Sequence, residues 1–250
     1  MNKCKLVLWL TLLINQAIAQ KSDTAFFPFQ DISIYNSISE DSVFIDYGKA
    51  INNCASLKIL DLDLDKISRS KLVYNLCIFP NLEILVINGF YHPTFIKRCG
   101  TALKMIVLGD FVNNINQVIT LLENTTYIDI IDNRIPELKR KHTKLLAKTE
   151  AFRFANNGTK LITFNNRTVF NLLSLDISGN NLKKIPKNIE NLEKLVYLDI
   201  SFNKSIKYIN PKRIKKLKNL KTLVIEGIEL QEKNLNELKQ LPLNLVFERK

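Results

Sequence analysis

Residues 172–194 read LLSLDISGNNLKKIPKNIENLEK, and residues 195–219 read LVYLDISFNKSIKYINPKRIKKLKN. The two stretches share one pattern, L-x-x-L-x-L-x-x-N-x-L. Its main positions are filled first by Leu172, Leu175, Ile177 and Asn180, and 23 residues later by Leu195, Leu198, Ile200 and Asn203. A pattern that recurs at this interval predicts a chain of stacked coils, because one such unit cannot bury its apolar face alone.

The same frame extends over most of the chain. Repeats begin at Leu57, Leu82, Leu103, Thr125, Thr149, Leu172, Leu195, Leu220 and Pro242, at intervals of 21 to 25 residues. The fourth and sixth positions of the other copies are all apolar, namely Leu60 and Leu62, Leu85 and Ile87, Ile106 and Leu108, Ile128 and Ile130, Phe152 and Phe154, Leu223 and Ile225, and Leu245 and Phe247. We therefore predict about nine coils over residues 57–250.

This pattern resembles the leucine-rich repeat family. The resemblance implies an α/β solenoid, a horseshoe with a parallel β-sheet on its concave face and short helical, 3₁₀ or irregular segments on its convex face. Residues 20–56 fit the repeat poorly, and GKAINNCASLKILDL at 48–62 is similar to the entry into the first coil of bacterial relatives. We expect an N-terminal cap there, or a degenerate first repeat at Phe29, Ile32 and Ile34.

The N-terminus has the features of a secretory signal peptide. Lys3 and Lys5 precede the apolar run LVLWLTLLI at 6–14, and Ala17-Ile18-Ala19 supplies small residues for cleavage. We predict a signal over residues 1–19 and a mature chain that is secreted, either outside the cell or into a periplasm. No later run reaches the roughly eighteen apolar residues that a membrane helix needs. The high Lys, Asn and Ile content indicates a bacterial source.

The mature chain is basic, with 34 basic and 24 acidic residues and a net charge of +10. The excess is concentrated at 134–148 and in the run KRIKKLK at 212–218. Such charge favours anionic partners in general. We expect the 212–218 run to lie on the convex side as a solvated face. Nucleic acid is not an expected partner, because no aromatic stacking pattern or known motif accompanies the charge.

Alternation along each strand divides its residues between two faces. The fourth and sixth positions point inward, and the third, fifth, seventh and eighth point out. At the ninth position the chain has Asn133, Asn157, Asn180 and Asn203, whose amides can bond to backbone groups at the strand ends. We therefore expect a ladder of buried asparagines along one side of the sheet.

The outward positions of the fourth to seventh coils give the candidate partner-binding residues, Tyr127, Asp129, Arg153, Asp176, Tyr197, Asp199 and Phe202. Tyrosine and arginine are over-represented at binding hot spots. We expect Tyr197→Ala and Arg153→Ala to weaken binding without altering stability. In the first coils the outward residues are Ile59, Ile84, Val86, Met105 and Val107. They predict an exposed apolar patch, unless the register is wrong or the N-terminal segment folds over the sheet.

Catalytic signals are few. The two histidines, His92 and His142, lie in different coils, and no nucleophile elbow, metal-binding spacing or phosphate loop is present. Asp176 and Asp199 should lie on adjacent strands, but nothing in the sequence buries either, so no separation of their pKa values is predicted. We expect a non-enzymatic protein without metal or cofactor. It would bind an unknown protein or peptide through its concave face; alternatively, an envelope or adhesion component would bind anionic polysaccharide or lipid through its basic convex face.

Three cysteines remain after signal removal, Cys54, Cys77 and Cys99, at intervals that match the repeat. Adjacent strands lie roughly 4.8 Å apart, and a disulfide accepts Cα separations of about 4.4 to 6.8 Å. Either Cys54 and Cys77 form a bridge, or all three are buried thiols in an internal ladder. Mass spectrometry after alkylation of unreduced, denatured protein tests this: a bridge gives one alkylated thiol, and a ladder gives three.

Overall fold

The computed structural model describes residues 122–247 without a break. Before them it describes residues 43–44, 57–63, 74–75, 79–88, 96–97, 103–109 and 115–117. The predicted signal peptide, the three cysteines, His92 and the segment around Phe29 lie outside the described residues.

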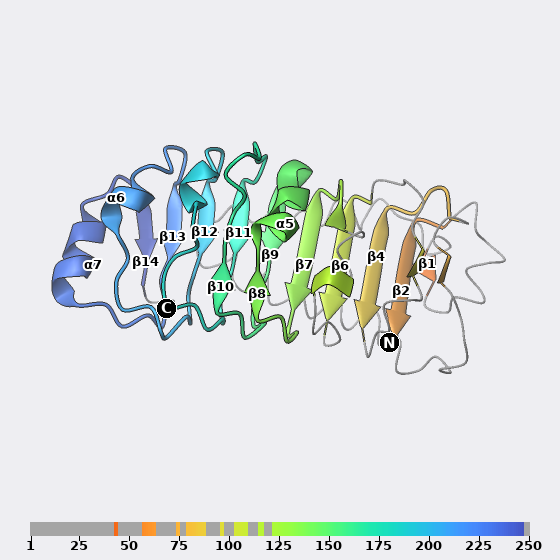
Figure 1. Ribbon diagram of the computed structural model, residues 1–250, viewed down its shortest axis with the longest axis horizontal. Helices are drawn as coiled ribbons and strands as arrows, with labels where there is room; N and C mark the ends of the chain where they lie inside the picture. Colours follow the sequence, from red (N-terminus) through yellow and green to blue (C-terminus); the bar gives the residue numbers. More distant parts are fainter. Residues whose placement is uncertain are drawn as a thin grey trace.

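One parallel sheet of ten strands runs along the described chain (Figure 1). Its strands, in spatial order, are β1 Val43–Phe44, β2 Ile59–Asp63, β4 Ile84–Asn88, β6 Met105–Gly109, β7 Tyr127–Ile131, β9 Ala151–Arg153, β11 Ser174–Asp176, β12 Tyr197–Asp199, β13 Thr222–Val224 and β14 Asn244–Val246. From β2 onward each strand begins at the third position of its predicted repeat, and the paired residues follow the same frame. The predicted solenoid is confirmed. β1 pairs with β2 and lies within segment 20–56.

The return side of the coils carries short elements (Figure 1). Two small parallel sheets form there, from β3 Tyr74–Asn75 with β5 Ile96–Lys97 and from β8 Glu137–Leu138 with β10 Leu161–Ile162. The helical turns are η5 Ile115–Gln117, α5 Arg140–Thr143, η6 Lys144–Lys148, η7 Ile189–Asn191, α6 Pro211–Ile214 and α7 Glu232–Lys239. Pro211 is the first residue of α6, a position that needs no backbone N–H, whereas η7 begins three residues after Pro186.

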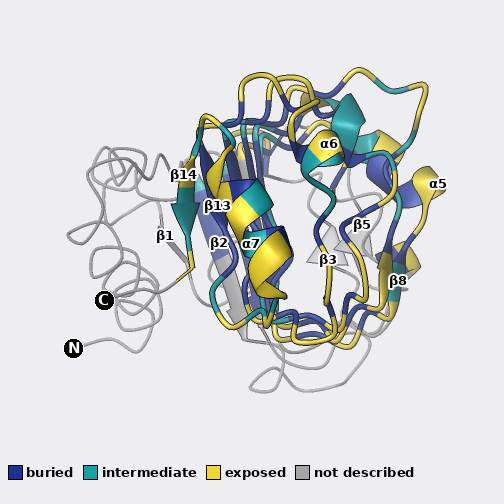
Figure 2. Cartoon of the chain, turned by 90° about the vertical axis from the view of Figure 1, so that its left-hand side faces the viewer, coloured by how far each residue is buried: buried dark blue, intermediate teal, exposed yellow. Residues whose placement is uncertain are grey.

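The core lies between the sheet and the return segments, as the view along the solenoid shows (Figure 2). Leu175, Ile177, Leu198 and Ile200 are completely buried, as are most other described side chains at the fourth and sixth positions. The ninth coil departs from this pattern, because Leu245 is only partly buried and Phe247 is 41% exposed. No coil of the described chain covers the outer edge of β14, so the last inward positions lack neighbours.

The predicted asparagine ladder is present, and Asn180 shows how it works. Its Oδ1 accepts hydrogen bonds from the backbone N–H groups of Asn157 and Thr159 in the preceding coil, both at 3.0 Å. Its Nδ2 donates to the carbonyl oxygens of Phe154 at 2.7 Å and Ile177 at 3.0 Å. The Nδ2 groups of Asn133, Asn157 and Asn203 likewise donate to carbonyl oxygens of the preceding coil, so these amides join each of these coils to its neighbour.

Replacing Asn180 by Ala should lower the free energy of unfolding by about 1 to 3 kcal/mol, because buried backbone groups of two coils lose their partners. Urea unfolding followed by circular dichroism measures the loss. Asn181→Ala is the matched control, since Asn181 is exposed and makes one long bond of 3.4 Å. Equal losses in the two variants would contradict a structural role for the ladder.

Candidate functional site

Four of the seven candidate residues form one line across the sheet. The strand pairing places Asp129, Arg153, Asp176 and Asp199 side by side on β7, β9, β11 and β12. We call these four residues the concave row. Tyr127 and Tyr197 occupy the third positions of their repeats, at the start of β7 and β12, with Ala151 and Ser174 between them. Phe202 follows β12, in the turn at the end of the strand.

These side chains are much less accessible than the sequence predicts. Asp129, Asp176, Tyr197 and Asp199 are only 1%, 8%, 5% and 3% exposed, while Phe202 is 44% exposed. The expectation that nothing buries Asp176 and Asp199 is therefore wrong. Tyr127, Arg153, Tyr197 and Asp199 all have interaction partners as well. In this structure the concave row is a closed polar layer, and Phe202 beside it is accessible.

The predicted apolar patch of the first coils is also absent at its described positions. Ile59, Ile84 and Val86 are 3%, 0% and 6% exposed. Their strands pair in the predicted register, so a register error does not explain the sequence pattern. The side chains of Met105 and Val107 lie outside the described residues.

Arg153 and Asp129 form a two-point ion pair. Arg153 Nε donates to Asp129 Oδ1 at 2.8 Å, and Arg153 Nη2 donates to Asp129 Oδ2. Burial alone would lower the pKa of Arg153, but the adjacent Asp129 carboxylate raises it above its usual value. Removing one partner of a buried ion pair leaves an uncompensated charge. Arg153→Ala should therefore destabilise the fold, contrary to the sequence-based expectation that stability is unaffected.

Asp176 and Asp199 lie directly opposite each other on adjacent strands. Asp176 Oδ1 accepts from the backbone N–H of Ser178 at 2.9 Å, and Asp199 Oδ1 accepts from the N–H of Ser201 at 2.8 Å. Burial, followed by the charge of Asp199, raises the pKa of Asp176 to about 7. A carboxyl group with a pKa near 7 can exchange a proton at neutral pH, but Asp176 is only 8% exposed and is not open to a substrate here.

Metal binding and histidine chemistry have no support at this surface. Within the part of the chain that the structure describes, no three His, Cys, Asp or Glu residues are placed to hold a metal ion. His142 is buried on the return side, where its Nδ1 accepts from the N–H of Lys139 at 3.2 Å. Burial, and then the charge of Lys141, lowers the pKa of His142. Its contacts are those of a residue that fixes the start of α5.

The eighth positions form a second ladder with an unusual backbone. Asp132, Asn156, Gly179, Phe202 and Gly227 have φ values of 57°, 56°, 63°, 55° and 67°. Gly, Asn and Asp adopt this left-handed conformation at low cost, whereas other residues lose about 1–2 kcal/mol. Phe202 is the bulky exception. Its ring lies over Gly227, where an added Cβ would come within 2.7 Å of Phe202 Cδ1.

No helix of the described residues has the length and apolar character needed to cross a bilayer.

Residues 170–230 match a sequence model described as leucine rich repeat. A leucine-rich repeat protein of Leptospira interrogans has a similar structure, with a TM-score of 0.59 at 20% identity over 82% of this chain and 58% of that one. An internalin of Listeria monocytogenes has a TM-score of 0.51 at 16% identity, over 78% of this chain and 56% of that one. A chain of the Drosophila Toll–Spatzle complex has a TM-score of 0.54 at 12% identity, over 81% of this chain and 30% of that one.

The chain thus spans less than two thirds of the length of each of these structures. No curated protein matches the sequence. At these identities the similarity establishes the fold of the chain and does not extend to its partners.

The raised pKa of Asp176 predicts a pH-dependent effect of Asp176→Asn. A carboxyl group whose pKa is higher in the folded state stabilises the fold below its unfolded pKa of 3.8, and this contribution is lost as pH rises towards 7. Asn cannot ionise. The free energy of unfolding of Asp176→Asn should therefore exceed that of wild type by about 2 to 4 kcal/mol at pH 8, and the two should differ little at pH 4. Chemical denaturation at the two pH values measures the difference.

Glu193→Gln is the control for this experiment, because Glu193 is an exposed acid of the same coil. A stability difference between Asp176→Asn and wild type that stays constant from pH 4 to pH 8 would show that Asp176 ionises normally.

Proposed function

We propose that this leucine-rich repeat protein is a secreted binding module that holds a protein or peptide partner at its concave sheet, with Phe202 as the anchoring side chain. Repeat solenoids offer long concave surfaces of this kind for recognition. The seven candidate residues then have unequal roles. Phe202 contacts the partner directly, and Tyr127 and Arg153 border the contact. The three buried aspartates and the buried Tyr197 support it.

The observation that carries this proposal is the exposed Phe202 in a left-handed backbone conformation. Strained residues gather at binding and catalytic sites, because the surrounding structure must hold them in place. Large aromatic side chains supply much of the binding energy at protein interfaces. Phe202 combines both properties, with φ of 55° and 44% exposure.

The neighbours of Phe202 hold it in a fixed position. Its backbone N–H donates to the carbonyl oxygen of Glu226 in the next coil at 2.7 Å. The preceding residue, Ser201, is bound through its N–H and Oγ to Asp199 Oδ1, at 2.8 and 2.5 Å. An anchor that is ordered before binding loses less conformational entropy when the partner docks. Asp199 therefore contributes to recognition by fixing the turn that carries Phe202.

The sequence-based alternative was binding of anionic polysaccharide or lipid through the convex lysines 215, 216 and 218. Their surroundings do not favour it. Glu190 and Glu193 lie on the return segment of the preceding coil, and Glu232 and Glu237 on that of the next. Arg213 of the same run is paired with Glu190 at 2.8 Å. This face carries both signs of charge.

Phe202→Asn tests the proposal, because Asn occupies the same position in the fifth coil and tolerates its backbone conformation. The melting temperature should stay equal or rise as strain is relieved. Binding of the partner should weaken about thirtyfold, the effect of losing roughly 2 kcal/mol from a central aromatic anchor. The partner is first isolated by cross-linked pull-down with wild-type protein from the envelope and culture medium of the source organism.

Tyr208→Ala is the matched control, since Tyr208 is an equally exposed aromatic residue on the return side of the same coil, at 55%. A partner that is retained by Phe202→Asn and lost by Tyr208→Ala would place recognition on the other side of the solenoid.

A further inference from the structure

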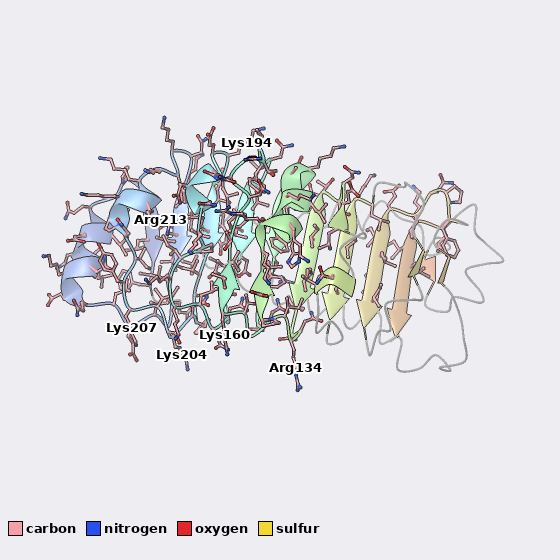
Figure 3. All side chains as sticks on the ribbon, in the orientation of Figure 1. Arg134, Lys160, Lys194, Lys204, Lys207 and Arg213 are labelled. Carbon is pink, nitrogen blue, oxygen red and sulfur yellow. The ribbon has the colours of Figure 1, made fainter. Side chains whose placement is uncertain are left out.

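A row of basic residues lies along the side of the solenoid where the strands end. The tenth to thirteenth positions of the fourth to seventh coils form the turns that follow the asparagine ladder, and we call this surface the turn edge. Its basic residues are Arg134, Lys160, Lys183, Lys184, Lys204 and Lys207. Figure 3 shows Arg134, Lys160, Lys204 and Lys207 pointing outward along one lower side of the molecule.

Acidic residues are missing from the segments that form most of this edge. Residues 156–168, 177–189 and 200–218 contain no aspartate or glutamate. Of the nearby acids, Asp132 is exposed beside Arg134, Glu137 is paired with Lys139 at 2.7 Å, and Glu229 is paired with Lys207 at 3.1 Å. Among the described residues, no ion pair involves Arg134, Lys160, Lys183, Lys184 or Lys204, and all five are exposed. The turn edge therefore carries uncompensated positive charge.

The backbone fixes these charges at the spacing of the coils. Lys160 N–H donates to the carbonyl oxygen of Pro136 at 2.9 Å, and Asn181 N–H donates to that of Thr159 at 2.9 Å. Leu182 N–H donates to Asn203 Oδ1 at 3.1 Å and joins the next pair of coils. Coils stack about 4.8 Å apart, so the backbones of neighbouring coils are closer than the screening length of about 8 Å. The charges of neighbouring coils repel one another unless an anion lies along the edge.

The turn edge differs from the convex run 212–218 in this respect. Both surfaces are rich in lysine, but the lysines of the convex run come from one coil and have glutamates on the coils at either side. The turn edge carries basic residues in four successive coils, and the one acid at its positions, Glu137, is paired with Lys139. A repeating single-sign array favours an extended polyanion, whereas a mixed face is an ordinary solvated surface.

We propose that the turn edge binds an anionic polysaccharide lying along the solenoid axis. A linear polymer can place successive sulfate or carboxylate groups beside successive coils. A lipid bilayer, by contrast, would contact only a strip one turn wide. Single-stranded nucleic acid normally adds stacking on successive aromatic rings. Among the fourth to seventh coils, exposed aromatic residues flank these charges only in the seventh, as Phe202 and Tyr208.

Heparin, a sulfated polysaccharide, is the probe for this site. The variant Lys160→Gln/Lys183→Gln/Lys204→Gln removes three charges from the turn edge, and Lys215→Gln/Lys216→Gln/Lys218→Gln removes three from the convex run. All six lysines are exposed, so both variants should melt at the wild-type temperature. Calorimetric titration of the full chain with a heparin oligosaccharide should show roughly tenfold weaker binding for the turn-edge variant and less than twofold for the convex variant.

If the two variants lost heparin affinity equally, net charge alone would account for the attraction, and the proposal would be overturned. Absence of measurable heparin binding by the wild-type chain would overturn it too. Titration with a single-stranded oligonucleotide separates the two classes of polymer: binding as tight as that of heparin, with the same loss in the turn-edge variant, would contradict a polysaccharide site. Phe202→Asn leaves all six lysines in place, so the test of Phe202 and the test of the turn edge give separate results.

Discussion

The bond between each ninth-position asparagine and the backbone of the coil before it is the interaction on which the described part of this solenoid depends. The strands of a parallel sheet end together, and each end leaves N–H and C=O groups without a partner in its own coil. In the fourth to seventh coils a buried amide satisfies them, with Asn180 alone bonded to both its own coil and the preceding one. Because coils contact only their neighbours, this local bond, repeated in four successive coils, joins the middle coils of the stack.

The residue before each ladder asparagine also has a special conformation. The eighth residue adopts a left-handed backbone in these four coils and at Gly227 of the next one, so five successive coils share it. Four of these positions have Asp, Asn or Gly, for which the conformation costs little. Phe202 therefore occupies a place where the fold requires no large side chain. Its exposure, and its rigid attachment through Ser201 and Glu226, agree with a role in binding.

Burial changes the chemistry of the concave row. Four charged groups on four adjacent strands would be ordinary surface residues in water, and each would titrate normally. In the closed layer the guanidinium of Arg153 is hydrogen-bonded to Asp129. Asp176 lies opposite Asp199 on the adjacent strand. Burial and the neighbouring carboxylate then raise the pKa of Asp176 to about 7. The concave row supports the turns beside it, and Phe202, not the row, is accessible to a partner.

The sequence by itself determined the repeat frame, the strand register, the inward positions and the asparagine ladder, because alternation along a strand and apolar periodicity are local consequences of backbone geometry. It also contained the signal for Phe202, an aromatic in a column of Asp, Asn and Gly. Only the tertiary structure decided that Asp176 and Asp199 are buried, and that Asn234 of α7 bonds to both backbone groups of Ile209 in the preceding coil. These features depend on contacts between side chains of adjacent coils. Such residues are more than twenty positions apart in the sequence, so no local sequence pattern predicts the contacts.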